Sequence, residues 1–222
     1  METIEQSPAV AAAPTDGRPR WLLIVLALVT AAALLAAGAG LAVATGIGSD
    51  RPPGESSVDA GFARDMSAHH EQATEMAQIV RDNGTDPEVR LMAYDMETQQ
   101  LGQIGQLRGW LDSWGRTPQS SRPPMSWMDG GHGMTAGQRM PGMATSAELA
   151  RLRTLSGRAL DVYFLQLMIR HHRGGLDMAL AAAEQASTPY VRELAGKVAQ
   201  AQQAEVVTME RTLRARGARP LS

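Results

Sequence analysis

The stretch 59-DAGFARDMSAHH-70 decides the fold, because it returns later in the chain as 161-DVYFLQLMIRHH-172. When residues 59–118 are laid over residues 161–220, an offset of 102 with no gap, 15 of the 60 positions are identical. A repeat at a fixed offset indicates one supersecondary unit that is built twice. We therefore expect unit one over residues 59–118 and a matching unit two over residues 145–220.

Each unit has the signals of a helical hairpin. In unit one, the apolar pattern predicts helices over about residues 59–82 and 86–114, separated by the break Asn83-Gly84-Thr85. Asp86 is a suitable N-cap, and a proline follows it in the first helical turn. Two hairpins of this size most simply make an all-α, four-helix bundle.

Unit two repeats this plan with an earlier start. Its break is Ser187-Thr188-Pro189, and its last helix stops before Gly217. Thr145 and Glu148 have the spacing of a capping box, which predicts that the first helix of this unit begins there and continues into the repeated stretch.

The N-terminal section has the features of a single transmembrane helix. No charged residue occurs from Trp21 to Ser49, and the apolar run can cross a hydrocarbon core of ~30 Å at ~1.5 Å per residue. Arg18 and Arg20 precede it, so the positive-inside rule predicts a membrane protein whose C-terminal domain is extracytoplasmic. The predicted order is a disordered cytoplasmic segment, the anchor, a linker and the helical domain, at residues 1–20, 21–45, 46–57 and 58–222.

Two other interpretations of the apolar run remain open. It could be a signal peptide cleaved near Ala42-Val43-Ala44, which would release the domain as a secreted protein. It could also be a buried helix of a soluble core, although it has no polar face. The membrane anchor and the cleaved signal peptide both place the repeated domain outside the cytoplasm.

Composition excludes several classes of function. The net charge is −2, which does not favour nucleic acid as a partner. Cysteine is absent, so disulfides, thiolate zinc sites and thiol catalysis are excluded. There is no glycine-rich phosphate loop and no His-Glu-x-x-His motif, and we expect no enzymatic activity. The chain has 13 methionines and five histidines, four of which form the two adjacent pairs.

The first histidine of each pair is predicted to point inward. Phe62, Met66, His69, Ala73, Met76 and Val80 follow one helical face, and unit two repeats the spacing. His69 and His171 lie on this face, whereas His70 and His172 are ~100° around the helix and should flank it. The hairpin register then places Gln103 near His69 and Glu205 near His171.

Imidazole and thioether side chains on one face suit copper, and thioethers favour Cu(I) in particular. The candidate ligands are the paired histidines, the methionines around them and one carboxylate: His69, His70, His171, His172, Met66, Met76, Met168, Met178 and Glu205. The competing interpretation is structural: methionine commonly fills cores, and a histidine on an apolar face commonly forms a hydrogen bond there.

The connection over residues 117–144 is rich in Pro, Gly, Ser and Met and is predicted to be a long loop. It carries one histidine, His132, and five methionines: Met125, Met128, Met134, Met140 and Met143. An exposed Met/His segment could collect copper. The alternatives are low-complexity drift and a methionine flap that closes over the bundle.

The repeated signature resembles that of the bacterial domain of unknown function 305 family. Asp161-x-x-Phe164-x-x-x-Met168-x-x-His171-His172, followed by Met178-Ala179 and preceded by Met140-Pro-Gly-Met143, carries the resemblance, and unit one repeats the signature. The resemblance covers about residues 58–217. It implies a ferritin-like bundle, export or membrane anchoring, and copper binding or copper resistance outside the cytoplasm.

The sequence therefore predicts an anchored extracytoplasmic protein that binds or buffers copper, with Cu(I) favoured. The alternative is a non-catalytic structural or interaction module in which the histidine pairs are hydrogen-bonded core residues. Because unit one has Gln103 where unit two has Glu205, the two units are expected to bind metal unequally. Neither a protein partner nor an oligomeric state follows from the sequence.

Overall fold

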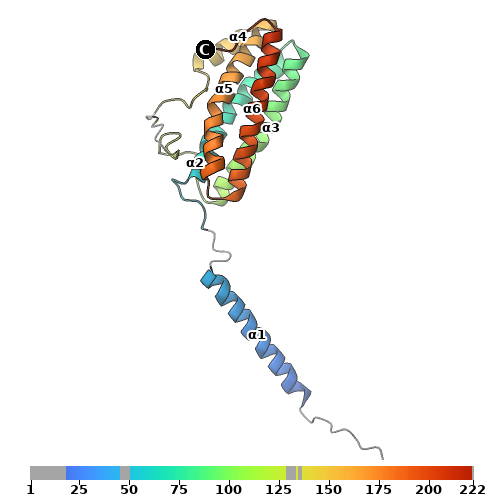
Figure 1. The fold of residues 1–222 in the computed structure, drawn as a ribbon, viewed down its shortest axis with the longest axis vertical. Helices are drawn as coiled ribbons and strands as arrows, with labels where there is room; N and C mark the ends of the chain where they lie inside the picture. The colour runs from blue at the N-terminus through green and yellow to red at the C-terminus, as the bar shows by residue number, and fades with distance from the viewer. Residues whose placement is uncertain (1–18, 46–50, 129–133, 135–136, 222) are drawn as a thin grey trace, which may run out of the picture. The chain divides into compact units, whose positions relative to one another are not determined.

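The computed structural model describes residues 19–45, 51–128, 134 and 137–221. These residues form helices and no strand, so the predicted all-α class is confirmed. The helices are α1 (Arg20–Thr45), α2 (Val58–Asn83), α3 (Pro87–Ser113), α4 (Ser146–Thr154), α5 (Gly157–Gln185) and α6 (Pro189–Ala215). The chain divides into two compact parts, residues 1–51 and 52–222, and the second is called the helical domain below (Figure 1).

The first compact part contains α1. Its segment Trp21–Leu41 has a mean hydropathy of 2.6 and is the one stretch of the described chain that is long and apolar enough to cross a membrane. None of it is buried against other protein, which is the opposite of a soluble core helix. The helix therefore fits either a membrane anchor or a signal sequence.

In the helical domain, the hairpins form where the sequence predicts them. Ser57 caps α2 by accepting a hydrogen bond from the backbone N–H of Ala60. The carboxylate of Asp86 accepts the N–H groups of Glu88 and Val89 at the start of α3, and Pro87 occupies the first turn. These caps satisfy backbone donors that would otherwise lack partners, which fixes where each helix begins.

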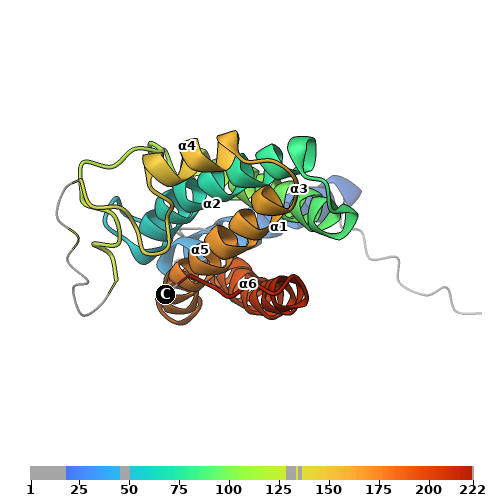
Figure 2. The same ribbon diagram turned by 90° about the horizontal axis from the view of Figure 1, so that it is seen from above.

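The first helix of unit two differs from the prediction. The capping box between Thr145 and Glu148 is present, but the helix that it opens, α4, ends at Thr154. A new helix, α5, begins at Gly157, whose φ of +55° is in the left-handed region that glycine adopts without a steric penalty. The expected continuous helix is therefore two helices, and α4 lies across α2 and α5 on the side away from α6 (Figure 2).

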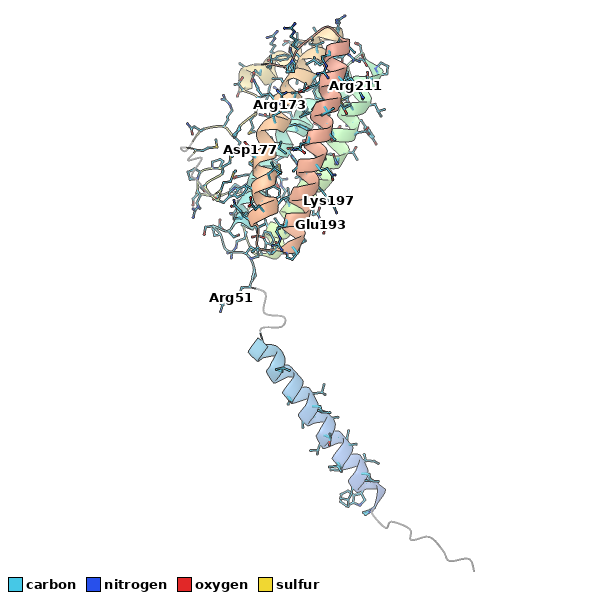
Figure 3. All side chains as sticks on the ribbon, viewed as in Figure 1. Arg51, Arg173, Asp177, Glu193, Lys197 and Arg211 are labelled. Atoms are coloured by element: carbon cyan, nitrogen blue, oxygen red, sulfur yellow. The ribbon has the colours of Figure 1, made fainter. Side chains whose placement is uncertain are left out.

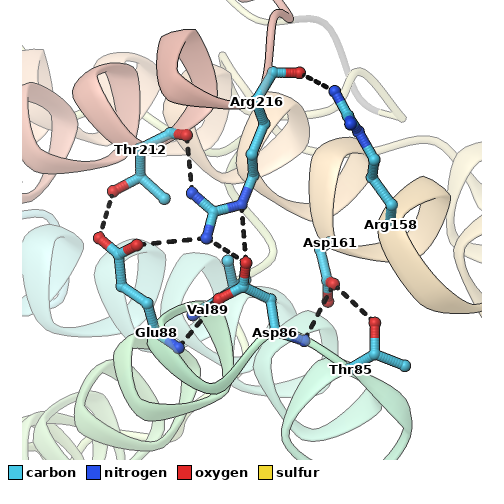
Figure 4. Close-up of polar contacts among 8 residues, drawn as sticks. All are labelled: Thr85, Asp86, Glu88, Val89, Arg158, Asp161, Thr212 and Arg216. Carbon is cyan, nitrogen blue, oxygen red and sulfur yellow. Dashed lines mark hydrogen bonds and ion pairs between the residues drawn. The ribbon is translucent and has the colours of Figure 1, made fainter.

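The two hairpins, α2–α3 and α5–α6, meet through α2 and α5. Asp59 at the start of α2 accepts four hydrogen bonds from the turn between α5 and α6, from the backbone N–H and hydroxyl groups of Ser187 and Thr188. Asp161, its equivalent in unit two, accepts from Thr85 and Asp86 in the other turn (Figure 4). The start of each first helix thus holds the turn of the opposite hairpin, so α2 and α5 run antiparallel.

The second helices, α3 and α6, are joined at both ends. At one end the guanidinium of Arg216 binds Asp86 and Glu88, and Thr212 donates to Glu88 (Figure 4). At the other end the indole N–H of Trp114 donates to the hydroxyl of Tyr190 at 3.1 Å. Arg216 and Trp114 are equivalent positions of the repeat, so duplication has kept the contact point while changing its chemistry.

Charged side chains are concentrated on the outer surface of the helical domain. Lys197 and Glu193 form an exposed pair one turn apart on α6 (Figure 3). The exposed Arg173 of α5 pairs with Glu210 of α6. Such exposed pairs contribute little to stability, because solvent screens them. The stability of the helical domain therefore depends mainly on its buried side chains.

Candidate metal site

His69 and His171 meet where α2 crosses α5. Their ring centroids are 3.8 Å apart, with an angle of 37° between the ring planes. Both side chains are buried, with at most 1% of their surface exposed. The prediction that the first histidine of each pair points inward is confirmed, and the two units contribute to one place rather than to two.

The second histidines lie ~100° around the helix from the first, as predicted, but the expectation that only the first histidine of each pair points inward is wrong. His70 and His172 are as deeply buried as their neighbours and do not reach the exterior. The Nε2 atom of His70 lies 2.7 Å from Oε1 of Gln103, and Nε2 of His172 lies 2.6 Å from Oε2 of Glu205. The polar partners expected for the first histidines thus belong to the second ones.

The reason is that each first helix packs along two other long helices. One is the second helix of its own hairpin, and the other is the first helix of the opposite hairpin. Adjacent positions on a helix differ by ~100°, so one histidine can face each neighbour. His69 faces α5, and His70 faces α3.

Three of the four rings use Nε2 in the same way. His69 donates from Nε2 to the carbonyl oxygen of Pro141 at 3.2 Å, and His70 and His172 have Gln103 and Glu205 as acceptors. A neutral imidazole carries one proton, so a ring that donates through Nε2 presents a lone pair at Nδ1. Among the described residues, none of these Nδ1 atoms has a hydrogen-bond partner, nor does either nitrogen of His171.

Two glutamines complete this buried layer, which comprises His69, His70, His171, His172, Gln100 and Gln202. Gln100 on α3 and Gln202 on α6 are equivalent positions of the repeat, and both are buried. Within the described part of the chain, Oε1 of Gln100 and both amide atoms of Gln202 lack a partner. The sequence interpretation missed these residues, although their identity in both units was a signal.

Burial keeps three histidines of the layer, His69, His70 and His171, neutral. It lowers the pKa of His69 to about 4 and that of His70 to about 3. Burial, together with the other rings, also holds the pKa of His171 well below its ordinary value. A neutral imidazole with a free lone pair is the form of histidine that binds a metal ion.

Methionines pack on both sides of the layer. Met66 and Met178 belong to one apolar cluster, and Met76 and Met168 belong to the other. All four are fully buried. One cluster also receives the loop methionines, and the other receives Met92, Met96 and Met209. Buried thioether side chains therefore occur in both apolar clusters of the helical domain.

The end of the loop between the units, at Pro141 and Gly142, packs against α5 beside the layer. Gly174 of α5 has no side chain, so the backbone of Pro141 lies directly against this helix. The carbonyl of Pro141 accepts the hydrogen bond from His69, and Gly142 follows with φ +79° against the backbone of Arg170. Gln72 fixes the loop end by bonding both backbone groups of Ala144.

The loop methionines are not an exposed collecting arm. Met125, Met128 and Met140 are at most 8% exposed, and Met134 and Met143 pack against the same apolar cluster. Asp65 on α2 holds this part of the loop by accepting from the backbone of Met125 and the indole of Trp127, both at 2.7 Å. The flap interpretation therefore fits the described residues of the loop. His132 lies outside them.

Gly175 gives the layer room. A Cβ at this position would lie 2.8 Å from Cε1 of His69 and 3.1 Å from Nε2 of Gln202. We expect Gly175→Ala to lower the free energy of unfolding by about 1–2 kcal/mol, because overpacking costs more than the helix propensity that alanine adds. Thermal or urea unfolding measures this change.

The matched control is Gly105→Ala on α3, where nothing lies within 4 Å of an added Cβ. This variant should raise the free energy of unfolding by up to about 1 kcal/mol. If both variants were equally stabilising, His69 and Gln202 would not be packed against Gly175 as described.

Comparison with known proteins bears on this site. The family described as Domain of unknown function (DUF305) matches residues 59–213. No match is found among curated proteins. A DUF305 protein from Streptomyces coelicolor is 46% identical. The match covers 76% of this chain and 99% of that chain, with a TM-score of 0.71. A DUF305 fragment from Deinococcus radiodurans is 32% identical. The match covers 71% of this chain and 96% of the fragment, with a TM-score of 0.59.

A third similar structure is CopM in a Cu(II)-bound form. It is 25% identical to this chain. The match covers 71% of this chain and 96% of CopM, with a TM-score of 0.55. CopM is also known in a Cu(I)-bound form, which is 23% identical and shows a likeness of fold.

Proposed function

The chain belongs to the DUF305 family, and from this premise we propose that its helical domain binds copper, with Cu(I) favoured, in the buried layer between α2 and α5. His69 and His171 would be the central ligands, with thioethers from Met66, Met76, Met168 and Met178 available on either side. His70, His172 and Glu205 complete the candidate set. The role is that of a non-catalytic buffer or carrier, held in a ferritin-like arrangement of the four long helices.

The observation that carries the proposal is the contact between His69 and His171. Two neutral rings lie 3.8 Å apart, and three of their four nitrogens have no partner among the described residues. A buried polar atom without a hydrogen bond costs about 1–3 kcal/mol, so such a cluster is unfavourable unless something binds it. An ion that accepts imidazole and thioether together fits this donor set.

The similarity to CopM supports the same conclusion from another direction, because that protein is known with copper bound. The apolar N-terminal helix supports a location outside the cytoplasm, either anchored or released after cleavage. The Streptomyces coelicolor relative is described as secreted, which agrees with that location.

The experiment is a Cu(I) titration of the full chain in detergent, in competition with a chromophoric chelator. The variant is His69→Ala combined with His171→Ala. Since replacement of partners behind a metal ligand already costs 10–100-fold in affinity, loss of both central ligands should weaken binding by more than about 100-fold.

Ile169→Ala is the matched control, because Ile169 is fully buried on α5 and its truncation also leaves a cavity. It should lower stability by about 2–4 kcal/mol while copper affinity is retained. If the double histidine variant binds copper as the parent does, the layer is instead a hydrogen-bonded structural core.

A further inference from the structure

A groove between α3 and α6 has a composition that duplication does not explain. It has a volume of about 220 Å³ and is lined by Met92, Asp95 and Met96 from α3 and by Ala204, Glu205 and Thr208 from α6. Met96 is nearly buried, Met92 is partly exposed and Asp95 is exposed. Two thioethers and two carboxylates thus line a groove that is open to solvent.

The equivalent positions of unit two have lost this chemistry. Leu194, Lys197 and Val198 stand where unit one has Met92, Asp95 and Met96, and Gln103 stands in place of Glu205. Lys197 is exposed on α6 and paired with Glu193 (Figure 3). One end of the domain therefore offers sulfur and negative charge, while its counterpart offers apolar side chains and a cation.

We propose that this groove is a second, outer site for a soft monovalent cation of the Cu(I) or Ag(I) type. Met92 and Met96 are one helical turn apart on the same face of α3, so both sulfurs can reach one ion. Thioether ligands select this class of metal. The carboxylates of Asp95 and Glu205 add negative charge, which attracts the cation and compensates its charge.

Glu205 links this groove to the buried layer. One carboxylate oxygen of Glu205 bonds Nε2 of His172 at 2.6 Å, while the residue also lines the groove. A cation held at Met92 and Met96 is therefore one side chain away from the histidines. The outer site does not depend on the buried one. If the buried layer binds copper as proposed above, the groove is also the place from which a cation passes to it; that role rests on the proposed function.

The test follows the methionine methyl resonances of the full chain in detergent, labelled with [¹³C-methyl]methionine and titrated with Ag(I). Met92→Leu and Met96→Leu, made singly, identify the two resonances by their disappearance. We expect both resonances to shift within the first equivalents of Ag(I). The double variant should bind at least one equivalent less, and Asp95→Asn should weaken binding at the groove several-fold.

Met125→Leu is the matched control, since it removes a thioether from the loop and should leave the shifts of Met92 and Met96 unchanged. In the His69→Ala, His171→Ala chain these two resonances should still respond, which separates the outer site from the buried one. The proposal is overturned if Ag(I) moves other methionines but not Met92 and Met96, or if the double leucine variant binds as many equivalents as the parent.

Discussion

Acidification from pH 7 to pH 4 is expected to unfold the helical domain. Three buried histidines carry the effect, because burial lowers the pKa of His69 to about 4, that of His70 to about 3 and that of His171 well below its ordinary value. In the unfolded chain each should titrate near its ordinary value of about 6.5. The unfolded state therefore binds more protons throughout the interval between these values.

This difference in bound protons means that the free energy of unfolding decreases as the pH decreases. Stability is complete above about pH 6.5 and falls as the pH decreases, until the folded-state pKa of each histidine is reached. Each group removes up to about 1.4 kcal/mol per pH unit. His69 and His70 together remove roughly 4–5 kcal/mol between pH 6 and pH 4, and His171 adds to this loss. The total is comparable to the stability of a marginal domain, since ordinary domains have about 5–15 kcal/mol.

Urea unfolding followed by circular dichroism at pH 7, 6, 5 and 4.5 measures this slope. His70→Gln removes one titrating ring and should reduce the slope by up to about 1.4 kcal/mol per pH unit. Glu193→Gln is a control, since this exposed carboxylate pairs with Lys197 on the surface of α6 and not with the buried histidines. A stability that stays constant from pH 7 to pH 4.5 would contradict the neutral buried layer.

Replacement of Asp59 by alanine is expected to lower the free energy of unfolding by about 3–5 kcal/mol. The side chain is buried and accepts four hydrogen bonds from Ser187 and Thr188. Although burial raises its pKa, these bonds outweigh that effect and hold the pKa of Asp59 below its ordinary value. Hydrogen bonds to a charged group contribute about 1.5–3 kcal/mol each and are not additive, which sets the expected range.

Asp59 also provides a cap that α6 lacks. Thr188, at the N-cap position of α6, forms no side-chain capping bond of its own, and the carboxylate from α2 accepts its N–H group instead. A negative charge at this end of a helix is additionally favoured by the helix dipole. The loss should therefore separate the two hairpins as well as fray α6.

Asp161→Ala is the matched comparison, because Asp161 is the position of unit two that is equivalent to Asp59. Asp161 accepts two bonds, both at 3.2 Å, and should cost only about 1–3 kcal/mol. Denaturant unfolding of the two variants gives the difference directly. Equal losses would mean that the count of hydrogen bonds does not determine the effect.

Much of the fold could be predicted from the sequence because duplication makes its signals visible twice. A helix break followed by a proline occurs in both units, and in unit one the cap at Asp86 marks the start of the second helix as well. The inward direction of His69 and His171 follows from one helical face. These features depend on neighbours within a few residues along the chain.

The features that could not be predicted depend on contacts between distant segments. His70 and His172 are buried because each first helix has two neighbours, which the register within one hairpin does not reveal. The loop methionines are buried because Asp65 and Gln72 bind the loop from α2. The end of α4 before α5 depends on a glycine with positive φ, which no periodicity marks.

X-ray absorption at the copper K-edge tests the central claim most directly. The account predicts that the full chain loaded with one equivalent of Cu(I) has imidazole nitrogen and thioether sulfur in its first coordination shell. In the His69→Ala, His171→Ala chain the nitrogen contribution should decrease, because the two central imidazole ligands are gone. A first shell without histidine nitrogen in the parent, or a nitrogen contribution unchanged in the variant, would contradict copper binding between α2 and α5.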